Sequence, residues 1–281
     1  MTDSSDGVAY GSGRGRWVLA VAVLGSGLAF LDGTVVNVAL PEIGRDLDAS
    51  TSSLQWILNG YLLTLASLIL LGGSLGDRYG RRRVFMLGAS LFTAASLLCA
   101  IAPNAELLVA ARVVQGIGGA LLTPGSLAMI ESGFRPGDRA RAIGAWSGLG
   151  GVATALGPLL GGFLVDAVSW RAIFLINLPI GIFVVAMARR HVPETRDPTA
   201  GGPLDLRGAV LVALGLAGTT FALIEAPGRG ISPAIVLTGA GGVAALVAFL
   251  RAERRSPNPM MPLSMFSSRQ FSAANAVTFV V

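Results

Sequence analysis

Long apolar runs alternate with short polar segments along almost the whole chain. A membrane-spanning helix needs about 20 mostly apolar residues, and eight of the runs are close to this length. The segments between them read as connections between consecutive spans. The pattern therefore predicts eight spans and the start of a ninth at Ala273, the eight lying at residues 18–40, 54–72, 84–102, 107–130, 142–165, 173–188, 208–224 and 233–250.

Composition points to the same class. The chain is 53% hydrophobic and 13% charged, whereas soluble domains carry about a quarter charged residues. We therefore expect an all-α polytopic membrane protein. Its predicted parts are a disordered cytoplasmic tail (1–16), a six-helix bundle (17–190), a cytoplasmic linker with two additional spans (191–251), and a cytoplasmic loop with the start of a truncated C-terminal bundle (252–281).

Arginine supplies all 21 basic residues, and its distribution predicts the orientation. With the N-terminus inside, the inside segments hold 17 arginines and the outside segments three, while Arg112 lies within a span. Short loops rich in Arg stay cytoplasmic, so we expect a multi-pass protein of the cell membrane with a cytoplasmic N-terminus. The arginines form no single patch, so the net charge of +5 does not indicate nucleic-acid binding.

Nothing in the sequence resembles the catalytic side chains of an enzyme. Cys99 is the one cysteine and lies in an apolar run, while His191 is the one histidine and lies in a polar loop. These two residues provide neither a cluster of His and Cys metal ligands nor an adjacent nucleophile and base. We expect no enzymatic activity, no metal and no cofactor.

An acid and a base lie inside the apolar runs. Counted along ideal helices, Asp32 is about 12 Å and Arg112 about 8 Å below the outer edge, so their depths are comparable. Intramembrane ionisable groups are rare and usually mark a pathway, so we expect Asp32, Asn37, Arg112 and Gln115 to line a cavity for proton and substrate. Two plainer possibilities remain: Asp32 is satisfied locally by Thr34 or Asn37, and Arg112 extends to the outer interface.

The connection between the second and third spans has an unusual composition. The stretch from residue 73 to residue 83 is predicted to be a tight turn and contains four arginines, one carboxylate and three glycines. Asp77 is the single anion in it, and it is either a local partner for Arg78 or Arg81 or a functional group. The residues that we assign to conformational gating here are Gly73, Asp77, Arg78, Gly80 and Arg81.

The fifth span is rich in glycine and interrupted by proline. Pro158 removes a backbone hydrogen bond, and glycines permit close contact between membrane helices. This pattern is typical of a bending, tightly packed helix, although packing without a mechanism explains it equally well. The residues concerned are Gly144, Gly157, Pro158, Gly161 and Gly162.

These motifs resemble those of a known family. The sequence Gly-x-Leu-Gly-Asp-Arg-x-Gly-Arg-Arg at 73–82 closely resembles the hairpin between helices 2 and 3 of the major facilitator superfamily. Arg-x-x-Gln-Gly at 112–116 resembles its helix 4 motif, and the glycines and proline of the fifth span resemble its antiporter motif, except that Ala153 stands where that motif has glycine. Leu-Asp-x-Thr-Val-Val-Asn-Val-Ala-Leu-Pro at 31–41 is similar to the 14-helix drug:proton antiporter branch.

The resemblance implies a six-helix N-terminal bundle and two extra helices, with the C-terminal bundle missing. It also implies proton-coupled export of lipophilic or cationic drugs or antibiotics across the cytoplasmic membrane by alternating access, as part of a longer protein. In that family the residue matched by Asp77 reaches a helix end in the other half and latches one state. The partners are then protons, a small lipophilic substrate, the lipid bilayer and the missing half, which transport requires.

We expect Asp32 to be the proton carrier, with Arg112 setting its affinity. Burial disfavours a charged carboxylate and a nearby guanidinium favours it, so a small movement between the two spans would switch its protonation. Two alternatives stay open on the sequence: a proton-coupled transporter of another small solute, and a truncated fragment that transports nothing.

Overall fold

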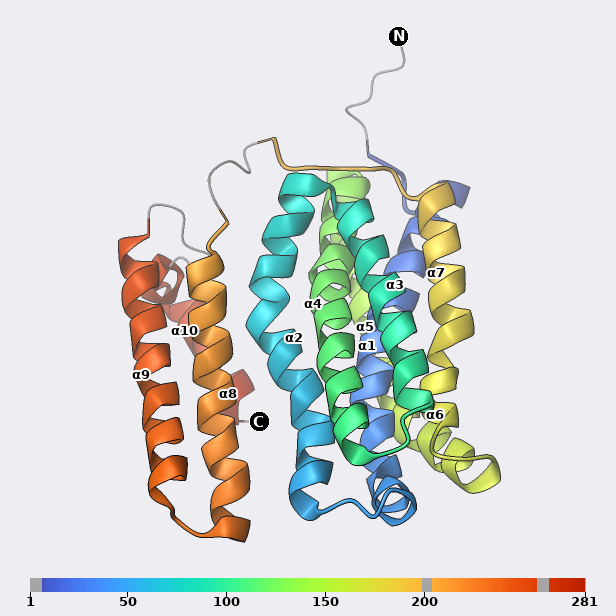
Figure 1. Ribbon diagram of the computed structural model, residues 1–281. Coiled ribbons are helices and arrows are strands. Elements are labelled where there is room, and N and C mark those ends of the chain that lie inside the picture. Colours follow the sequence, from blue (N-terminus) through green and yellow to red (C-terminus); the bar gives the residue numbers. More distant parts are fainter. Residues whose placement is uncertain (1–6, 199–203, 257–262, 281) are drawn as a thin grey trace. The chain divides into compact units, whose positions relative to one another are not determined.

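The computed structural model describes residues 7–198, 204–256 and 263–280, and nearly all of them are helical (Figure 1). The chain divides into two compact units, Met1–Gly201 and Gly202–Val281. Unit 1 contains α1 (Gly13–Asp46), α2 (Thr51–Tyr79), α3 (Arg81–Ala100), α4 (Ala105–Gly133), α5 (Pro136–Ala167), α6 (Ala172–Leu175) and α7 (Asn177–His191). Unit 2 contains α8 (Leu206–Arg229), α9 (Pro233–Arg255), the 3-10 helix η1 (Leu263–Ser267) and α10 (Arg269–Val280).

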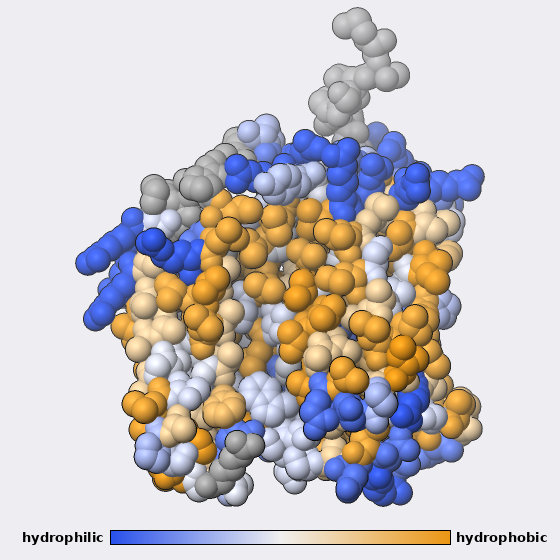
Figure 2. Space-filling model, in the orientation of Figure 1, coloured by the Kyte–Doolittle hydropathy of each residue, from blue (hydrophilic) through white to orange (hydrophobic). Residues whose placement is uncertain are grey.

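Within the part of the chain that the structure describes, eight segments are long and apolar enough to cross a membrane, with α6 and α7 together forming the sixth. All eight predicted spans are therefore confirmed, and Ile176 alone separates α6 from α7. Figure 2 shows apolar side chains along the middle of α2, α3 and α7 in unit 1 and hydrophilic side chains at their ends. This distribution matches a lipid-facing surface, because charged groups avoid hydrocarbon.

Helix α4 lies at the centre of unit 1, packed against α1, α2 and α3. In its most apolar window 56% of the residues are buried, against 17% for α5 at the periphery. Glycine permits the close contacts: a Cβ at Gly116 would lie 2.6 Å from the Tyr61 carbonyl oxygen of α2, and one at Gly118 would lie 2.5 Å from the Phe92 nitrogen of α3. Small residues at membrane helix contacts allow this backbone approach.

The predicted disorder of the tail is wrong for residues 7–16, while residues 1–6 lie outside the described part of the chain. Val8 forms an isolated bridge to Phe134, with its N–H donating to the Gly133 carbonyl at 2.7 Å. The Ser12 side chain then caps α1, accepting a hydrogen bond from the Gly15 N–H. These backbone bonds fix the segment to the α4–α5 connection, which its polar composition did not indicate.

The predicted hairpin between the second and third spans is present, but its turn is much shorter than the predicted stretch 73–83. Helix α2 continues to Tyr79 and α3 begins at Arg81, so only Gly80 is non-helical. Gly80 has φ 116° and ψ 124°, a backbone conformation that side chains with a Cβ rarely adopt. A single glycine therefore makes the reversal, and the charged residues around it belong to helix ends.

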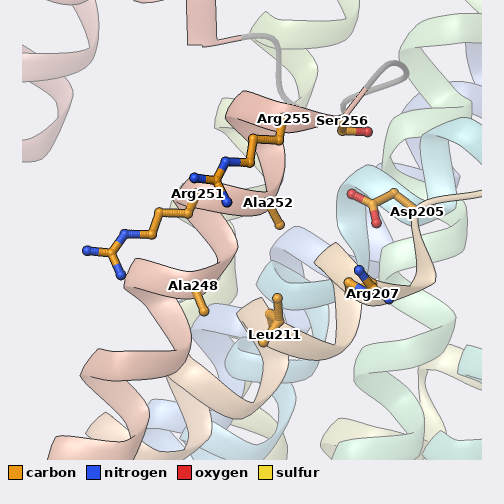
Figure 3. A pocket seen from close by; sticks show the side chains of 8 residues that line it. All are labelled: Asp205, Arg207, Leu211, Ala248, Arg251, Ala252, Arg255 and Ser256. Atoms are coloured by element: carbon orange, nitrogen blue, oxygen red, sulfur yellow. The ribbon is translucent and has the colours of Figure 1, made fainter.

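Unit 2 is built on the antiparallel pair α8 and α9. A Cβ at Gly242 would lie 2.5 Å from the Thr219 backbone nitrogen, so the pair is in close contact. At one end of the pair a cleft is lined by Asp205, Arg207, Arg251 and Arg255, together with Leu211 and Ala248 (Figure 3). Asp205 accepts a hydrogen bond from the Gly208 N–H at 2.8 Å and so caps α8.

Candidate functional site

The centre of unit 1 holds a buried ion pair between α1 and α4. The guanidinium of Arg112 donates through Nη1 to Oδ2 of Asp32, and both side chains are only 1% exposed. Gln115 joins the pair, accepting from Arg112 Nη1 at 2.7 Å and donating through Nε2 to Asp32 Oδ1 at 2.8 Å. The structure thus brings together three of the four residues predicted to line the site.

Side chains of three further helices complete the network. Ser96 of α3 accepts hydrogen bonds from Gln115 Nε2 at 2.9 Å and from Asn177 Nδ2 of α7 at 3.3 Å. From α2, the Ile57 carbonyl accepts from Arg112 Nε at 3.0 Å, and the ring of Tyr61 lies 4.3 Å from the guanidinium carbon. The network therefore connects α1, α2, α3, α4 and α7 around one charge pair.

Both plainer possibilities for these residues are excluded by the geometry. Thr34 Oγ1 donates to the carbonyls of Phe30 and Leu31, so it does not satisfy Asp32. The Arg112 side chain is buried and directed at Asp32, so it does not extend to the interface. A buried ion pair is stable only where hydrogen bonds satisfy its remaining atoms, and Gln115 and the Ile57 carbonyl do so here.

Asn37 is the predicted site residue that the structure does not bring to the network. Its side chain is exposed and donates to the Gly33 carbonyl of its own helix at 2.8 Å. Five residues along an α-helix correspond to about 140° of rotation, so Asn37 faces away from Asp32. Ser96 and Tyr61 contribute instead, although a serine and a tyrosine in apolar runs gave no signal in the sequence.

A narrow cavity has Asp32 among the residues that line it. Its walls are formed by α1, α5, α6 and α7, and include Val35, Leu160, Ile173 and Asn177. The space in this cavity that the centre of a water molecule can occupy is about 10 Å³. This volume holds about one water molecule. The cavity is too small for a drug-sized molecule.

The end of unit 1 at which α2 meets α3 carries the predicted gating residues. Asp77, in the last turn of α2, pairs through Oδ1 with Arg81 Nη2 at 2.7 Å and Nε at 2.8 Å. The guanidinium of Arg78 lies 5.8 Å from the ring of Tyr79. Gly73 faces Pro124 of α4, whose Cβ is 3.7 Å from a Cβ placed on the glycine. The local partner of Asp77 is therefore Arg81.

The segment after α7 crosses this hairpin, which the sequence did not indicate. Glu194 Oε1 accepts from the Arg82 N–H at 3.1 Å, and its Oε2 lies 3.6 Å from the guanidiniums of Arg82 and Arg83. The Thr195 carbonyl accepts from the Arg81 N–H at 3.0 Å. The unpaired N–H groups at the start of α3 are thus satisfied by residues more than 100 positions away.

The glycines predicted for the fifth span lie on two faces of α5. Gly157 and Gly161 face α1, where a Cβ at Gly157 would lie 1.9 Å from Thr34 Oγ1 and one at Gly161 3.1 Å from Val35 Cγ1. Among the described residues, nothing lies within 4 Å of a Cβ placed at Gly144 or Gly162. Helix α5 continues through Pro158 without interruption. One face packs against α1, and the other is open.

Within the described residues, no three His, Cys, Asp or Glu side chains come together as metal ligands. The site is a buried carboxylate paired with a buried guanidinium. Comparison with known proteins identifies the fold that carries it. The model of the Major Facilitator Superfamily matches residues 22–279. The chain belongs to this superfamily of membrane transporters.

Several relatives of this major facilitator chain are antibiotic or drug resistance proteins. It is 40% identical to a methylenomycin A resistance protein of Bacillus subtilis (strain 168), over 96% of this chain and 58% of the relative. It is 42% identical to a probable actinorhodin transporter of Streptomyces coelicolor, over 94% of this chain and 47% of the relative. The multidrug resistance protein Stp of Mycobacterium tuberculosis is 38% identical, with coverages of 92% and 48%. The chain spans about half the length of these relatives.

Solved structures confirm the fold. The peptide transporter POT in complex with sulfate matches with a TM-score of 0.64 at 16% identity, over 89% of this chain and 55% of that one. A bacterial homolog of the human lysosomal transporter Spinster matches with a TM-score of 0.56 at 23% identity, over 88% and 63%. The prediction of a multi-pass major facilitator protein related to drug exporters is therefore confirmed.

Proposed function

We propose that this chain is the N-terminal half of a proton-coupled exporter of lipophilic or cationic drugs or antibiotics. Its N-terminus is cytoplasmic, and export proceeds by alternating access between this half and a second one. The names of the antibiotic and multidrug resistance relatives support the substrate class. The arginine-rich connections at one end of the helices support the orientation.

The buried pair of Asp32 and Arg112 is the observation that carries the proposal. An ionised carboxylate in hydrocarbon is costly, so its retention at the centre of the bundle indicates a role in the transport pathway. When Asp32 takes up a proton it loses its attraction for Arg112, and α1 is then free to move against α4. When it releases the proton, its charge is available to the guanidinium or to a cationic drug. Proton and drug are therefore competitors.

The driving force is sufficient for such an exchange. One proton moving inward across 100 mV releases about 2.3 kcal/mol, which supports a roughly 50-fold drug gradient per proton. The substrate-binding site also needs a second side, which these helices alone do not provide. Transporters of this kind bind their substrate at the interface of two repeats. The second half is therefore part of the proposal.

The test is Asp32→Asn in the complete transporter, reconstituted in proteoliposomes. We expect drug-induced proton release to fall to the level of protein-free vesicles in the properly folded fraction. Glu106→Gln is the matched control, since it also removes one carboxylate charge but from the exposed first turn of α4. Proton-coupled efflux retained by Asp32→Asn contradicts the proposal, and the coupling acid then lies elsewhere.

A further inference from the structure

A groove on the outer surface of unit 1 runs between α3 and α7, which lie side by side (Figure 1). Its walls are apolar and its rims are exposed, with Leu97 42% and Ile182 66% accessible. Thr93 and Gly181 meet at its floor, where a Cβ on Gly181 would lie 1.8 Å from Thr93 Oγ1. The groove therefore depends on a glycine that lets the two helices touch.

Three arginines surround one end of this groove. Arg189 and Ser90 line it, and the same two residues line a second recess that also includes Arg82 and Arg83. The apolar groove and the basic recess therefore adjoin at these two residues. Glu194 is the carboxylate here, 3.6 Å from both Arg82 and Arg83. Three cations against one anion leave the recess positively charged.

The length of the groove matches the thickness of the hydrocarbon in one leaflet of a bilayer. From Leu178 to Arg189 the groove follows 12 residues of α7, and the 11 steps between them give a rise of about 16 Å. Half of the hydrocarbon core is about 15 Å thick. An acyl chain along the groove therefore reaches the middle of the membrane when its headgroup lies beside Arg189.

We propose that this groove binds an anionic phospholipid of the arginine-side leaflet. The phosphate lies among Arg82, Arg83 and Arg189, and an acyl chain follows the apolar groove above Thr93. Basic pockets between membrane helices recognise acidic headgroups in this way. The site is separate from Asp32 and goes beyond the proposed transport cycle.

The residue types favour a lipid over another helix as the occupant. Helix contacts in membranes use small residues, and the open face of α5 offers them at Gly144, Gly148 and Gly162. Small residues such as Thr93 and Gly181 form the floor of the groove, but its rims carry the large aliphatic side chains of Leu97 and Ile182, which suit a flexible acyl chain. Charge complementarity at one end then selects an acidic headgroup.

The experiment is native mass spectrometry of the purified 281-residue chain with equal amounts of dioleoyl phosphatidylglycerol and dioleoyl phosphatidylcholine. We expect phosphatidylglycerol to be retained preferentially. Arg83→Gln and Arg189→Gln should each lower that preference about five-fold, because an arginine near an acidic headgroup contributes about that factor. Arg83 and Arg189 are exposed, so both variants are expected to fold.

Two matched variants make the test specific. Arg190→Gln removes the same charge from the next residue of α7, which does not line the groove, and should leave the preference unchanged. Ala186→Trp fills the groove without changing charge and should reduce retention of both lipids. The proposal is overturned if Arg190→Gln acts as strongly as Arg189→Gln, or if neither groove arginine matters. It is equally overturned if the chain is a lipid-free dimer, since a second copy then covers the groove.

Discussion

At the scale of single residues, the charges were predictable and their neutral partners were not. Asp32 and Arg112 stand out because an ionisable group at membrane depth needs a partner, and their comparable depth is consistent with a contact between them. Ser96 and Tyr61 complete the network, but such residues are ordinary in apolar runs. Asn37 is close to Asp32 in the sequence, but the rotation of the helix between the two residues directs its side chain away from the network.

Gly80→Ala tests the one-residue reversal between α2 and α3. The added Cβ would meet Glu194 Oε1 at 2.6 Å in a backbone conformation that alanine rarely adopts. We expect a loss of about 1–3 kcal/mol in the free energy of unfolding, seen as a lower Tm of the purified chain in detergent. Gly148→Ala is the control, because nothing among the described residues lies within 4 Å of its Cβ position. Equal Tm values for the two variants would refute this account of the hairpin.

At the scale of helices, hydropathy located the eight spans found among the described residues but not where the helices end. Apolar runs indicate the residues that lie in the hydrocarbon core. The helices continue beyond these residues where capping side chains and ion pairs stabilise the additional turns. Helix α2 passes its last apolar residues and ends at Tyr79, where the Asp77–Arg81 pair bridges to α3. The contact of Glu194 with the same hairpin joins distant segments, so no local pattern predicts it.

Gly157→Ala tests the contact between α1 and α5. Its Cβ would lie 1.9 Å from Thr34 Oγ1 and 2.9 Å from Thr34 Cβ, so the two helices must separate. Overpacking of this kind costs about 1–3 kcal/mol, and we expect a corresponding fall in Tm. Gly162→Ala, on the open face of the same helix, should leave the Tm unchanged. A fall for Gly162→Ala and none for Gly157→Ala would show that the two faces have been assigned the wrong way round.

At the scale of the whole molecule, the family motifs predicted the fold, and composition predicted the membrane class. The division into units lies at Gly201, eleven residues beyond the predicted boundary, because residues 192–197 pack on the α2–α3 hairpin. The polar composition of residues 192–197 had indicated that they belong to the cytoplasmic linker. The substrate cannot be derived from these helices, since the opposite wall of the transport site belongs to the second half of the proposed transporter.

Asp77→Asn in the complete transporter tests the proposed latch. A carboxylate at the end of α2 can meet the positive end of a helix dipole in the second half and hold one state. We expect turnover in proteoliposomes to fall much more than drug affinity measured by equilibrium binding. Glu131→Gln, an exposed charge near the end of α4, should change neither. Parallel losses of binding and turnover, or no loss, would leave Asp77 as a local partner of Arg81 alone.

The most direct measurement compares Asp32→Asn with the double variant Asp32→Asn, Arg112→Gln in the complete transporter. The single variant leaves a buried guanidinium without its anion, which costs about 3–5 kcal/mol, whereas the double variant removes both charges together. We predict that the double variant regains most of the lost Tm and still shows no drug-induced proton release. Recovery of proton release together with stability would contradict the account, because Asp32 would then only hold the helices together.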